Sequence, residues 1–309
     1  MTNAASTAMR PGRPATSEMV RRLPEVLMIW VPLLLSAAHL IAFSLWTIWI
    51  SLTPSTLVPV SGWVGLRNYS AVAASRNWQI ALDNLLLFGS AFVLLSLATG
   101  LILAILLDQR IRGENLLRSI FLYPLAVSFV VTGTVWSWLL NPGLGIQKLV
   151  HDLGWTSFRF DWLIDRDMAI WTIVVAAIWQ SSGFAMALFL AGLRSVDADL
   201  IKAAQIDGAG PVRMYRRVIL PTLWPITITV IVIQLQFAIS TFDLVRALTN
   251  GGPGIATQLP ALVVYDLMFQ RSLLGRGAAA AVLMLLILLA VLLPYAAWRY
   301  IQRRRAIHA

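Results

Sequence analysis

Residues that could carry catalysis are scarce in this chain. It contains no cysteine, two lysines and three histidines. Lys148 follows Gln147 and Lys202 follows Ile201, so the Gly-Lys-Ser/Thr core of a phosphate-binding loop is absent. The histidines lie far apart, at positions 39, 151 and 308, and form no metal-ligand spacing. We therefore expect no catalytic residue and no metal site, and any energy source must lie in another protein.

Two groups of uncharged polar side chains stand out because they lie inside long apolar stretches. One stretch contains Trp179-Gln180-Ser181-Ser182, and another contains Gln234 and Gln236 followed by Ser240 and Thr241. An amide that faces lipid is costly, so we expect these groups to face protein or a water-filled cavity. There they could hydrogen-bond a polar ligand or join neighbouring helices, and the sequence leaves both functions open.

The overall composition places these groups in a membrane. Hydrophobic residues make up 59% of the 309 residues and charged residues only 12%, whereas a soluble domain has about 25% charged residues. Six stretches contain no Asp, Glu, Lys or Arg, and each exceeds the roughly 20 residues that cross a bilayer as a helix. They are Val26–Ile50, Asn84–Leu107, Ser119–Leu140, Met168–Leu193, Leu220–Phe242 and Ala278–Trp298. The sequence therefore predicts an all-α integral membrane protein with six transmembrane helices.

The basic residues orient these predicted spans. With segments 1–25, 108–118, 194–219 and 299–309 on one side of the bilayer, that side carries 16 Lys and Arg residues and the other side carries 8. The acidic residues divide equally, so the asymmetry follows the positive-inside rule. Both termini are then predicted to be cytoplasmic. This topology explains the net charge of +10, and we expect the bilayer, and no nucleic acid, as the partner of the basic residues.

The longest internal cytoplasmic segment, 194–219, has the pattern of a helix, a turn and a second helix. Asp199 lies in the first turn of a stretch that runs to Ile206, where an acid favours the helix dipole. Asp207-Gly208 ends this helix, and Pro211 suits the first turn of the next helix. Apolar residues of this segment have no core of their own, which favours a docking element over a simple connector. They are Leu200, Ile201, Ile206 and Tyr215.

At these residues the sequence resembles the permease subunits of bacterial binding-protein-dependent ABC importers. The signature loop of that family reads Glu-Ala-Ala, two residues, Asp-Gly-Ala, five residues, Phe, two residues, Ile, one residue and Leu-Pro. Tyr215 and Val218 are conservative changes at two of these positions. Seven residues agree in type and spacing: Ala203, Ala204, Asp207, Gly208, Ala209, Leu220 and Pro221.

Lys202 reverses a charge of the family's loop. The family has an acid at this position, in the helix that docks into a groove of the ATPase. Because the apolar contacts and the glycine turn remain, the resemblance implies that docking is retained. Its electrostatics must differ, either through Asp199 or through an altered groove.

The resemblance covers residues 80–300 and implies the fold of a type I ABC importer permease. It implies a heterodimer with a second permease subunit, two copies of an ABC ATPase that bind ATP and Mg, and a periplasmic sugar-binding protein. No cofactor is expected in this chain. The polar groups around Gln180 and Gln234 then become candidates for a substrate pathway in which amides and hydroxyls match sugar hydroxyls.

Shorter motifs are similar to the glucose/mannose branch of the family, with the α-glucoside permeases as a near alternative. The motifs are Trp138-Leu-Leu-Asn-Pro-Gly143, Asp161-Trp-Leu-Ile164, Ala191-Gly-Leu-Arg194 and the loop residues from Ala203 to Ala209. We expect a cytoplasmic tail over 1–25, a first span and periplasmic loop over 26–79, the permease core over 80–300, and a basic cytoplasmic tail over 301–309. The core includes the coupling loop 194–219.

The remaining features leave alternatives open. The acidic residues of segment 141–167 are either a solvated surface or a docking surface for a binding protein. We interpret Ile255–Phe269 as a periplasmic or interfacial helix, since Pro260 and Asp266 interrupt it. A secondary transporter or channel that works alone is disfavoured by the missing intramembrane charges, and a membrane enzyme is disfavoured by the missing catalytic residues.

Overall fold

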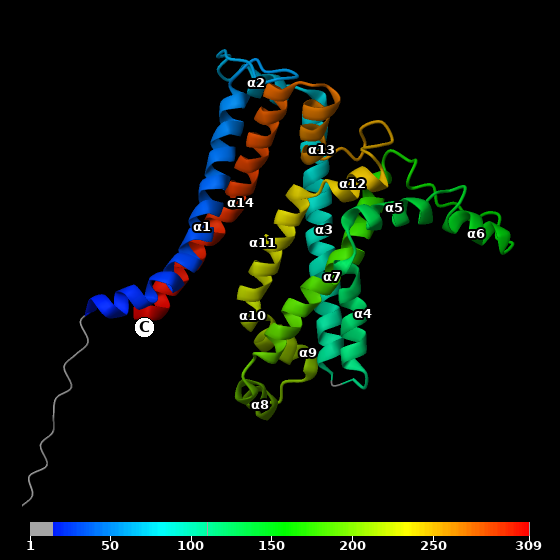
Figure 1. Cartoon of the computed structure of the whole chain (residues 1–309). Helices are drawn as coiled ribbons and strands as arrows, with labels where there is room; N and C mark the ends of the chain where they lie inside the picture. The colour runs from blue at the N-terminus through cyan, green and yellow to red at the C-terminus, as the bar shows by residue number, and fades with distance from the viewer. Residues whose placement is uncertain (1–14, 110, 309) are drawn as a thin grey trace, which may run out of the picture. The chain divides into compact units, whose positions relative to one another are not determined.

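A computed structural model describes residues 15–109 and 111–308, and its regular elements in these ranges are helices. The chain divides into two compact units. The first, Met1–Trp49, holds most of helix α1 (Ala15–Ser51), and the second, Ile50–Ala309, holds the other elements (Figure 1). Residues 1–14 of the predicted N-terminal tail and Ala309 of the predicted basic tail lie outside the described residues.

Four helices are long and apolar enough to cross a membrane. One is the Trp30–Ser51 part of α1, and the others are α3 (Arg76–Asp108), α7 (Ala169–Arg194) and most of α14 (Leu274–His308). Two further apolar segments are bent pairs of helices. The described helices therefore give six spans if each bent pair crosses the membrane once, and the predicted count of six rests on that condition.

The third predicted span consists of two helices instead of one. α4 (Glu114–Ala126) and α5 (Phe129–Leu139) meet at an angle of 97°. Pro124 near the end of α4 has no N–H for the helical ladder. Val127 is extended, and the Ser128 hydroxyl caps α5 by accepting a hydrogen bond from the Val131 N–H at 3.2 Å. The chain therefore turns sharply within an apolar stretch that contains no charge to mark the turn.

The fifth predicted span also begins later than its lack of charge suggests. α9 (Pro211–Met214), the π-helical turn η1 (Tyr215–Ile219) and α10 (Leu220–Thr222) form one continuous segment. At Leu223 the chain bends by 66° into α11 (Trp224–Ser240), whose first turn contains Pro225. Leu220 and Pro221 thus belong to the segment that arrives from the loop, because the membrane helix starts after the bend.

In the second unit, α7 packs along α3, with α4 and α11 beside it (Figure 1). Small residues allow the closest approaches. A Cβ atom on Gly183 of α7 would lie 2.0 Å from the Phe121 carbonyl oxygen of α4, and one on Gly100 of α3 would lie 2.5 Å from the Ala185 Cβ. Such contacts between small residues and backbone are typical of membrane helix pairs. Lipid tails are as apolar as the side chains, so the helices associate mainly through close packing. The core is therefore held by close packing of these helices.

Short helices join the long ones within the second unit. α2 (Arg67–Ala73) and α13 (Pro260–Tyr265) lie at one end of α3, and α8 (Ala198–Ile206) lies at the opposite end (Figure 1). The remaining short elements are α6 (Ile146–Asp152), α12 (Asp243–Leu248) and the π-helical turn η2 (Asp266–Gln270). The helix predicted over Ile255–Phe269 thus begins later than predicted, at Pro260, and continues through η2 to Gln270.

Candidate functional sites

The loop 194–219 folds as the predicted helix, turn and helix, which confirms that local prediction. The Asp197 carboxylate caps α8 by accepting a hydrogen bond from the Asp199 N–H at 2.9 Å. After α8 ends at Ile206, Gly208 adopts φ +72°, in the left-handed region that favours glycine. This conformation lets the Ala209 N–H donate to the Ala204 carbonyl at 3.0 Å and closes the helix end. α9 then begins at Pro211.

α8 and the start of α9 present apolar side chains that are exposed in the second unit. Ile206 is 86% exposed and Val212 is 81% exposed, and Leu200 is 47% exposed. Lys202 Nζ lies 3.0 Å from Asp199 Oδ1, and both side chains are largely exposed. An exposed ion pair of this kind contributes little stability, but it offsets the positive charge of Lys202 within its own helix. An exposed apolar group on a short helix is typical of an interaction surface.

The other loop residues of the predicted set differ in exposure. Ala204, Ala209 and Tyr215 are half-buried. The exposed members are Asp199, Lys202, Ala203, Asp207, Gly208, Leu220 and Pro221. Most of the predicted coupling residues are therefore accessible to a partner, whereas Tyr215 turns back toward the helix bundle.

An ion-pair cluster joins the base of this loop to three helices. Arg194, at the end of α7, places Nη2 at 2.7 Å from Glu114 Oε1 and Nε at 3.8 Å from Asp108 Oδ1. Arg118 also pairs with Glu114. The Tyr215 hydroxyl accepts a hydrogen bond from Gln109 Nε2 at 3.4 Å. These contacts connect the loop to the end of α3 and the start of α4. Sequence reasoning missed them because the charges lie in separate loops and resemble ordinary solvated residues.

The Trp179 side chain lines a hollow of about 470 Å³ between α5 and α7, and Gln180 is the next residue of α7 but lies outside that lining. The Trp136 and Trp179 rings meet edge to face, with their centroids 6.1 Å apart. Gln180 Nε2 donates to the Val127 carbonyl at the break between α4 and α5, at 2.6 Å. Buried Gln180 Oε1 and Thr132 Oγ1 have no hydrogen-bond partner among the described residues. The lining is completed by four apolar residues: Val127, Val131, Val135 and Leu139.

The structure does not gather the two predicted polar groups into one site. Ser240 and Thr241 border a separate hollow of about 50 Å³. Their hydroxyls donate to the carbonyls of Gln236 and Phe237, at 2.8 and 2.6 Å, as a hydroxyl within a helix commonly does. Gln234 is fully buried, and neither atom of its amide has a partner among the described residues. Neither Gln234 nor Gln236 lines either hollow.

The remaining polar residues of the fourth span are less accessible. Ser181 is buried and Ser182 is half-buried on α7. Val127, Thr132 and Trp136 line the larger hollow but were not predicted as site residues, because they resemble ordinary residues of a continuous span. Pro124 and Ser128 were the signals of the break that brings these residues to α7. In the part of the chain that the structure describes, no three His, Asp or Glu residues are placed to hold a metal ion.

Comparison with known proteins decides the family. Residues 96–307 match the family described as the binding-protein-dependent transport system inner membrane component. The match spans more than two thirds of the chain and contains both bent spans and the loop 194–219. The chain belongs to this family. It is therefore a multi-pass inner-membrane permease subunit, a non-catalytic component whose ATPase is a separate protein.

Three related permeases align with most of this chain. It is 37% identical over 281 residues to a probable ABC transporter permease of Pyrococcus horikoshii, covering 90% of this chain and 96% of the relative. It is 33% identical over 245 residues to the sn-glycerol-3-phosphate permease of Rhizobium meliloti, covering 79% and 82%. It is 32% identical over 250 residues to the trehalose/maltose permease of Thermococcus litoralis, covering 81% and 84%.

A solved structure shares the fold of this permease. The crystal structure of a bacterial ABC transporter that imports the acidic polysaccharide alginate matches with a TM-score of 0.74 and 19% identity. The match covers 93% of this chain and 99% of the matched chain. At this identity the similarity establishes the fold alone, which is the ABC importer permease fold predicted from the sequence.

Proposed function

We propose that this permease is one half of the translocation pathway of an ATP-driven sugar importer. The observation that carries the proposal is the hollow beside Trp136 and Trp179. None of its lining residues is charged, whereas a phosphorylated substrate would need arginine or lysine partners. Indole rings offer apolar faces to the C–H surface of a sugar. Thr132 also lines the hollow, and its Oγ1 has no partner among the described residues, so this hydroxyl could bind a hydroxyl group of the sugar.

The substrate class follows from these groups and from the relatives. One relative is named for trehalose and maltose and another for sn-glycerol-3-phosphate. The uncharged hollow favours a neutral sugar over the phosphate ester. The sequence motifs around Trp138 and Asp161 favour a monosaccharide such as glucose or mannose, and an α-glucoside or other oligosaccharide is the alternative.

The importer would assemble from several proteins around this chain. A second permease would pair with it as a heterodimer, and a periplasmic sugar-binding protein would deliver the substrate. Two ATPase copies would bind ATP and Mg on the cytoplasmic side, with α8 docking into a groove of one of them. Exposed Ile206 and Leu200 support this docking, because they are apolar and lie on a short helix at the end of the bundle. Both termini of the permease would be cytoplasmic.

The geometry suggests how docking would drive transport. Closure of the ATPases would move α8 as a rigid body. Tyr215 and Arg194 would pass this displacement to the ends of α3 and α4 through the contacts of Gln109, Asp108 and Glu114. The helices around the hollow would then switch between inward-facing and outward-facing arrangements.

Uptake in cells that lack this chain tests the proposed substrate. Reintroduced permease should restore uptake of a labelled neutral sugar, and unlabelled glucose, mannose and maltose should be ranked as competitors. We expect sn-glycerol-3-phosphate not to compete. Trp179→Ala should reduce uptake on the order of tenfold, since an aromatic contact is worth about 1 kcal/mol or more. Trp138→Ala removes an exposed indole outside the hollow and serves as the matched control. Unchanged sugar uptake in the Trp179 variant would place the sugar elsewhere.

A further inference from the structure

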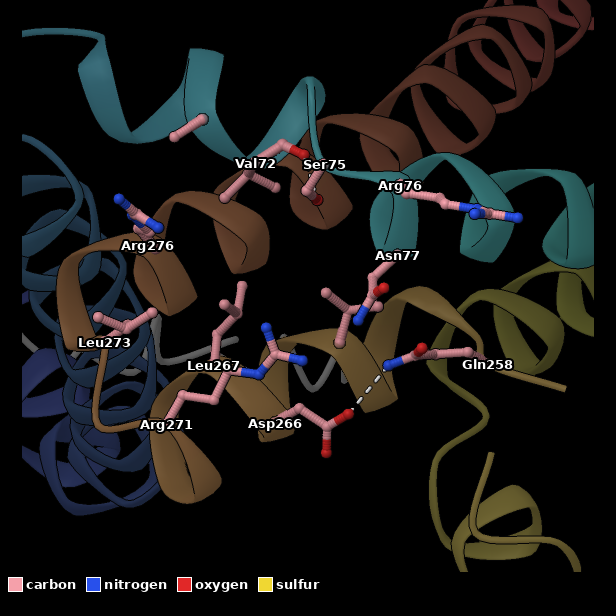
Figure 2. Close-up of a pocket in the computed structure, with 12 residues that line it drawn as sticks. Val72, Ser75, Arg76, Asn77, Gln258, Asp266, Leu267, Arg271, Leu273 and Arg276 are labelled. Carbon is pink, nitrogen blue, oxygen red and sulfur yellow. Dashed lines mark hydrogen bonds between the residues drawn. The ribbon is translucent and has the colours of Figure 1, made fainter. Parts of the chain in front are cut away.

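A third hollow, of about 140 Å³, lies at the opposite end of α3 from α8 and differs in its charge from the hollow beside Trp136 and Trp179 (Figure 2). Its walls come from α2, the start of α3, the loop before α13, η2 and the start of α14. This volume exceeds the minimum of about 10–15 Å³ that one water molecule needs. That space also suits one tetrahedral oxyanion.

Positive charge dominates the lining. Arg76, Arg271 and Arg276 line the hollow, and Asp266 is its one acidic residue. Among the described residues, no carboxylate lies within 4 Å of these three guanidinium groups. Figure 2 shows the Arg271 side chain reaching into the hollow beside Leu267, and Arg276 on the facing wall. The hollow therefore carries an excess of positive charge that the second unit does not neutralise.

The walls are fixed by hydrogen bonds within the second unit. Asn84 Nδ2 donates to the carbonyls of Ala256 and Gln258, at 2.9 and 3.0 Å, and ties their loop to α3. The Arg271 N–H donates to the Asp266 carbonyl at 2.9 Å. The Gly275 N–H donates to the Ser55 carbonyl at 2.8 Å and holds the start of α14. The arginines thus project from a preformed frame, which lowers the entropic cost of binding.

One buried acceptor in the hollow has no partner. The Gln258 side chain is 3% exposed. Its Nε2 donates to Asp266 Oδ2 at 2.9 Å, which leaves Oε1 facing no donor among the described residues (Figure 2). An unsatisfied buried oxygen of this kind costs free energy. A ligand that carries a hydroxyl or a protonated oxygen beside its negative charge would remove that cost.

The hollow also lies where two membrane-crossing helices begin. Arg76 is the first residue of α3, and Arg276 is the third residue of α14. Both helices are long and apolar enough to span a bilayer. Arginines near the ends of membrane-crossing helices reach toward the lipid headgroups, and basic pockets between such helices bind phosphate headgroups.

We propose that this hollow binds a phosphate group that also carries a hydroxyl or a protonated oxygen. Arg271 and Arg276 would hold the phosphate oxygens, because guanidinium groups bind phosphate through paired, charge-assisted hydrogen bonds. Gln258 Oε1 would accept the hydroxyl. Two sources share this chemistry, the phosphoglycerol headgroup of phosphatidylglycerol and free inorganic phosphate. A carboxylate from a protein partner fits less well, because an ionised carboxylate has no proton to donate to Gln258.

Ligand titration of the purified full-length chain in an uncharged detergent tests the proposal. The probes are a short-chain phosphatidylglycerol, the matching phosphatidylcholine and inorganic phosphate, followed by tryptophan fluorescence. We expect phosphatidylglycerol to bind more tightly than phosphatidylcholine, which lacks the free hydroxyl and the net charge. Arg271→Gln with Arg276→Gln should weaken this binding on the order of tenfold or more, since each charged hydrogen bond is worth that order. Arg159→Gln, an exposed arginine outside the hollow, should leave it unchanged.

The remaining arms identify the source of the phosphate and guard against misfolding. If inorganic phosphate binds and its binding depends on the same two arginines, the site is one for a free anion. If inorganic phosphate does not compete with phosphatidylglycerol, the site is one for the lipid headgroup. Replacing both arginines by lysine keeps the charges but removes the paired guanidinium hydrogen bonds, so it should weaken binding less than the double glutamine variant does. The proposal fails if the double glutamine variant binds both probes as the wild type does, or if neither probe binds.

Discussion

At the scale of single residues, the backbone of Gly208 is the most specific feature of the loop. Its φ of +72° closes α8, and no neighbouring atom lies within 4 Å of the position of a Cβ. A substitution there would therefore cause backbone strain without a steric clash. The sequence predicted this turn from Asp207-Gly208, because glycine is the usual residue just past a helix end.

Replacing Gly208 should uncouple the permease from its ATPase. Gly208→Val places a β-branched residue in the left-handed region, at a cost of about 1–3 kcal/mol. We expect the variant to insert normally but to lose most ATP-driven uptake and ATPase co-purification. Gly210→Val is the matched control, since Gly210 has φ −66° and ψ 165° and open space around it. Normal uptake and ATPase recovery with Gly208→Val would contradict the coupling function.

Asp266 should make stability depend on pH. Burial raises the pKa of its carboxyl above the ordinary value, and Arg271 and Arg246 lower it in part. The folded protein therefore holds this proton more tightly than the unfolded chain does. As the pH rises and the carboxyl loses its proton, the free energy of unfolding falls. Asp266→Asn should therefore melt at a higher temperature than the wild type at about pH 8, and this difference should shrink toward about pH 4.

The melting temperature can be followed by the fluorescence of the 13 tryptophans. Asp161→Asn removes an exposed carboxylate of another loop and controls for the loss of one charge. A difference between Asp266→Asn and the wild type that is constant with pH would show that the effect is not electrostatic.

At the scale of elements, close contact between α7 and α4 positions the larger hollow. Gly183 lies three residues after Gln180, and a Cβ at Gly183 would meet backbone that cannot move independently of α4. Gly183→Ala should therefore separate the two helices and destabilise the protein by about 1–3 kcal/mol, as overpacking does. The readout is a lower melting temperature together with reduced uptake.

Gly143→Ala is the control for this substitution. The atom nearest to its new Cβ would be Asn141 Oδ1, at 3.5 Å, which is ordinary contact. We expect the melting temperature of this variant to equal that of the wild type within experimental error. An unchanged melting temperature in Gly183→Ala would show that α4 and α7 do not pack at the described distance.

The elements also show what sequence reasoning could and could not predict. The absence of charge located every long apolar segment, because charge is costly in a bilayer. It could not locate the bends at Val127 and Leu223, because a bent apolar segment has the same composition as a straight one. Pro124, Ser128 and Pro225 carried that information. The contact of Gln180 with the Val127 carbonyl depended on the first bend, so the sequence found the glutamine but missed Val127. It missed Thr132 and Trp136 for the same reason, because the bend brings them to the hollow.

At the scale of the whole molecule, the uneven distribution of basic residues predicts the topology. The chain contains no cysteine, so single cysteines can report the side of the membrane. Ile206→Cys should react with an impermeant thiol reagent only in inside-out vesicles, and Leu153→Cys only in right-side-out spheroplasts. Both side chains are at least 80% exposed in the isolated chain, so a chain expressed without its ATPase leaves both cysteines accessible to the reagent. Labelling of both residues from one side would contradict the predicted orientation.

The central claim is that this permease couples to a separate ATPase through α8. The most direct measurement is cross-linking from Ile206→Cys, in membranes that contain the whole importer, to a cysteine in the groove of the ATPase. We expect an adduct of permease and ATPase whose yield changes when ATP is bound, and no adduct from Leu153→Cys. Absence of an adduct from both Ile206→Cys and Leu200→Cys, in membranes that still show ATP-driven uptake, would contradict it.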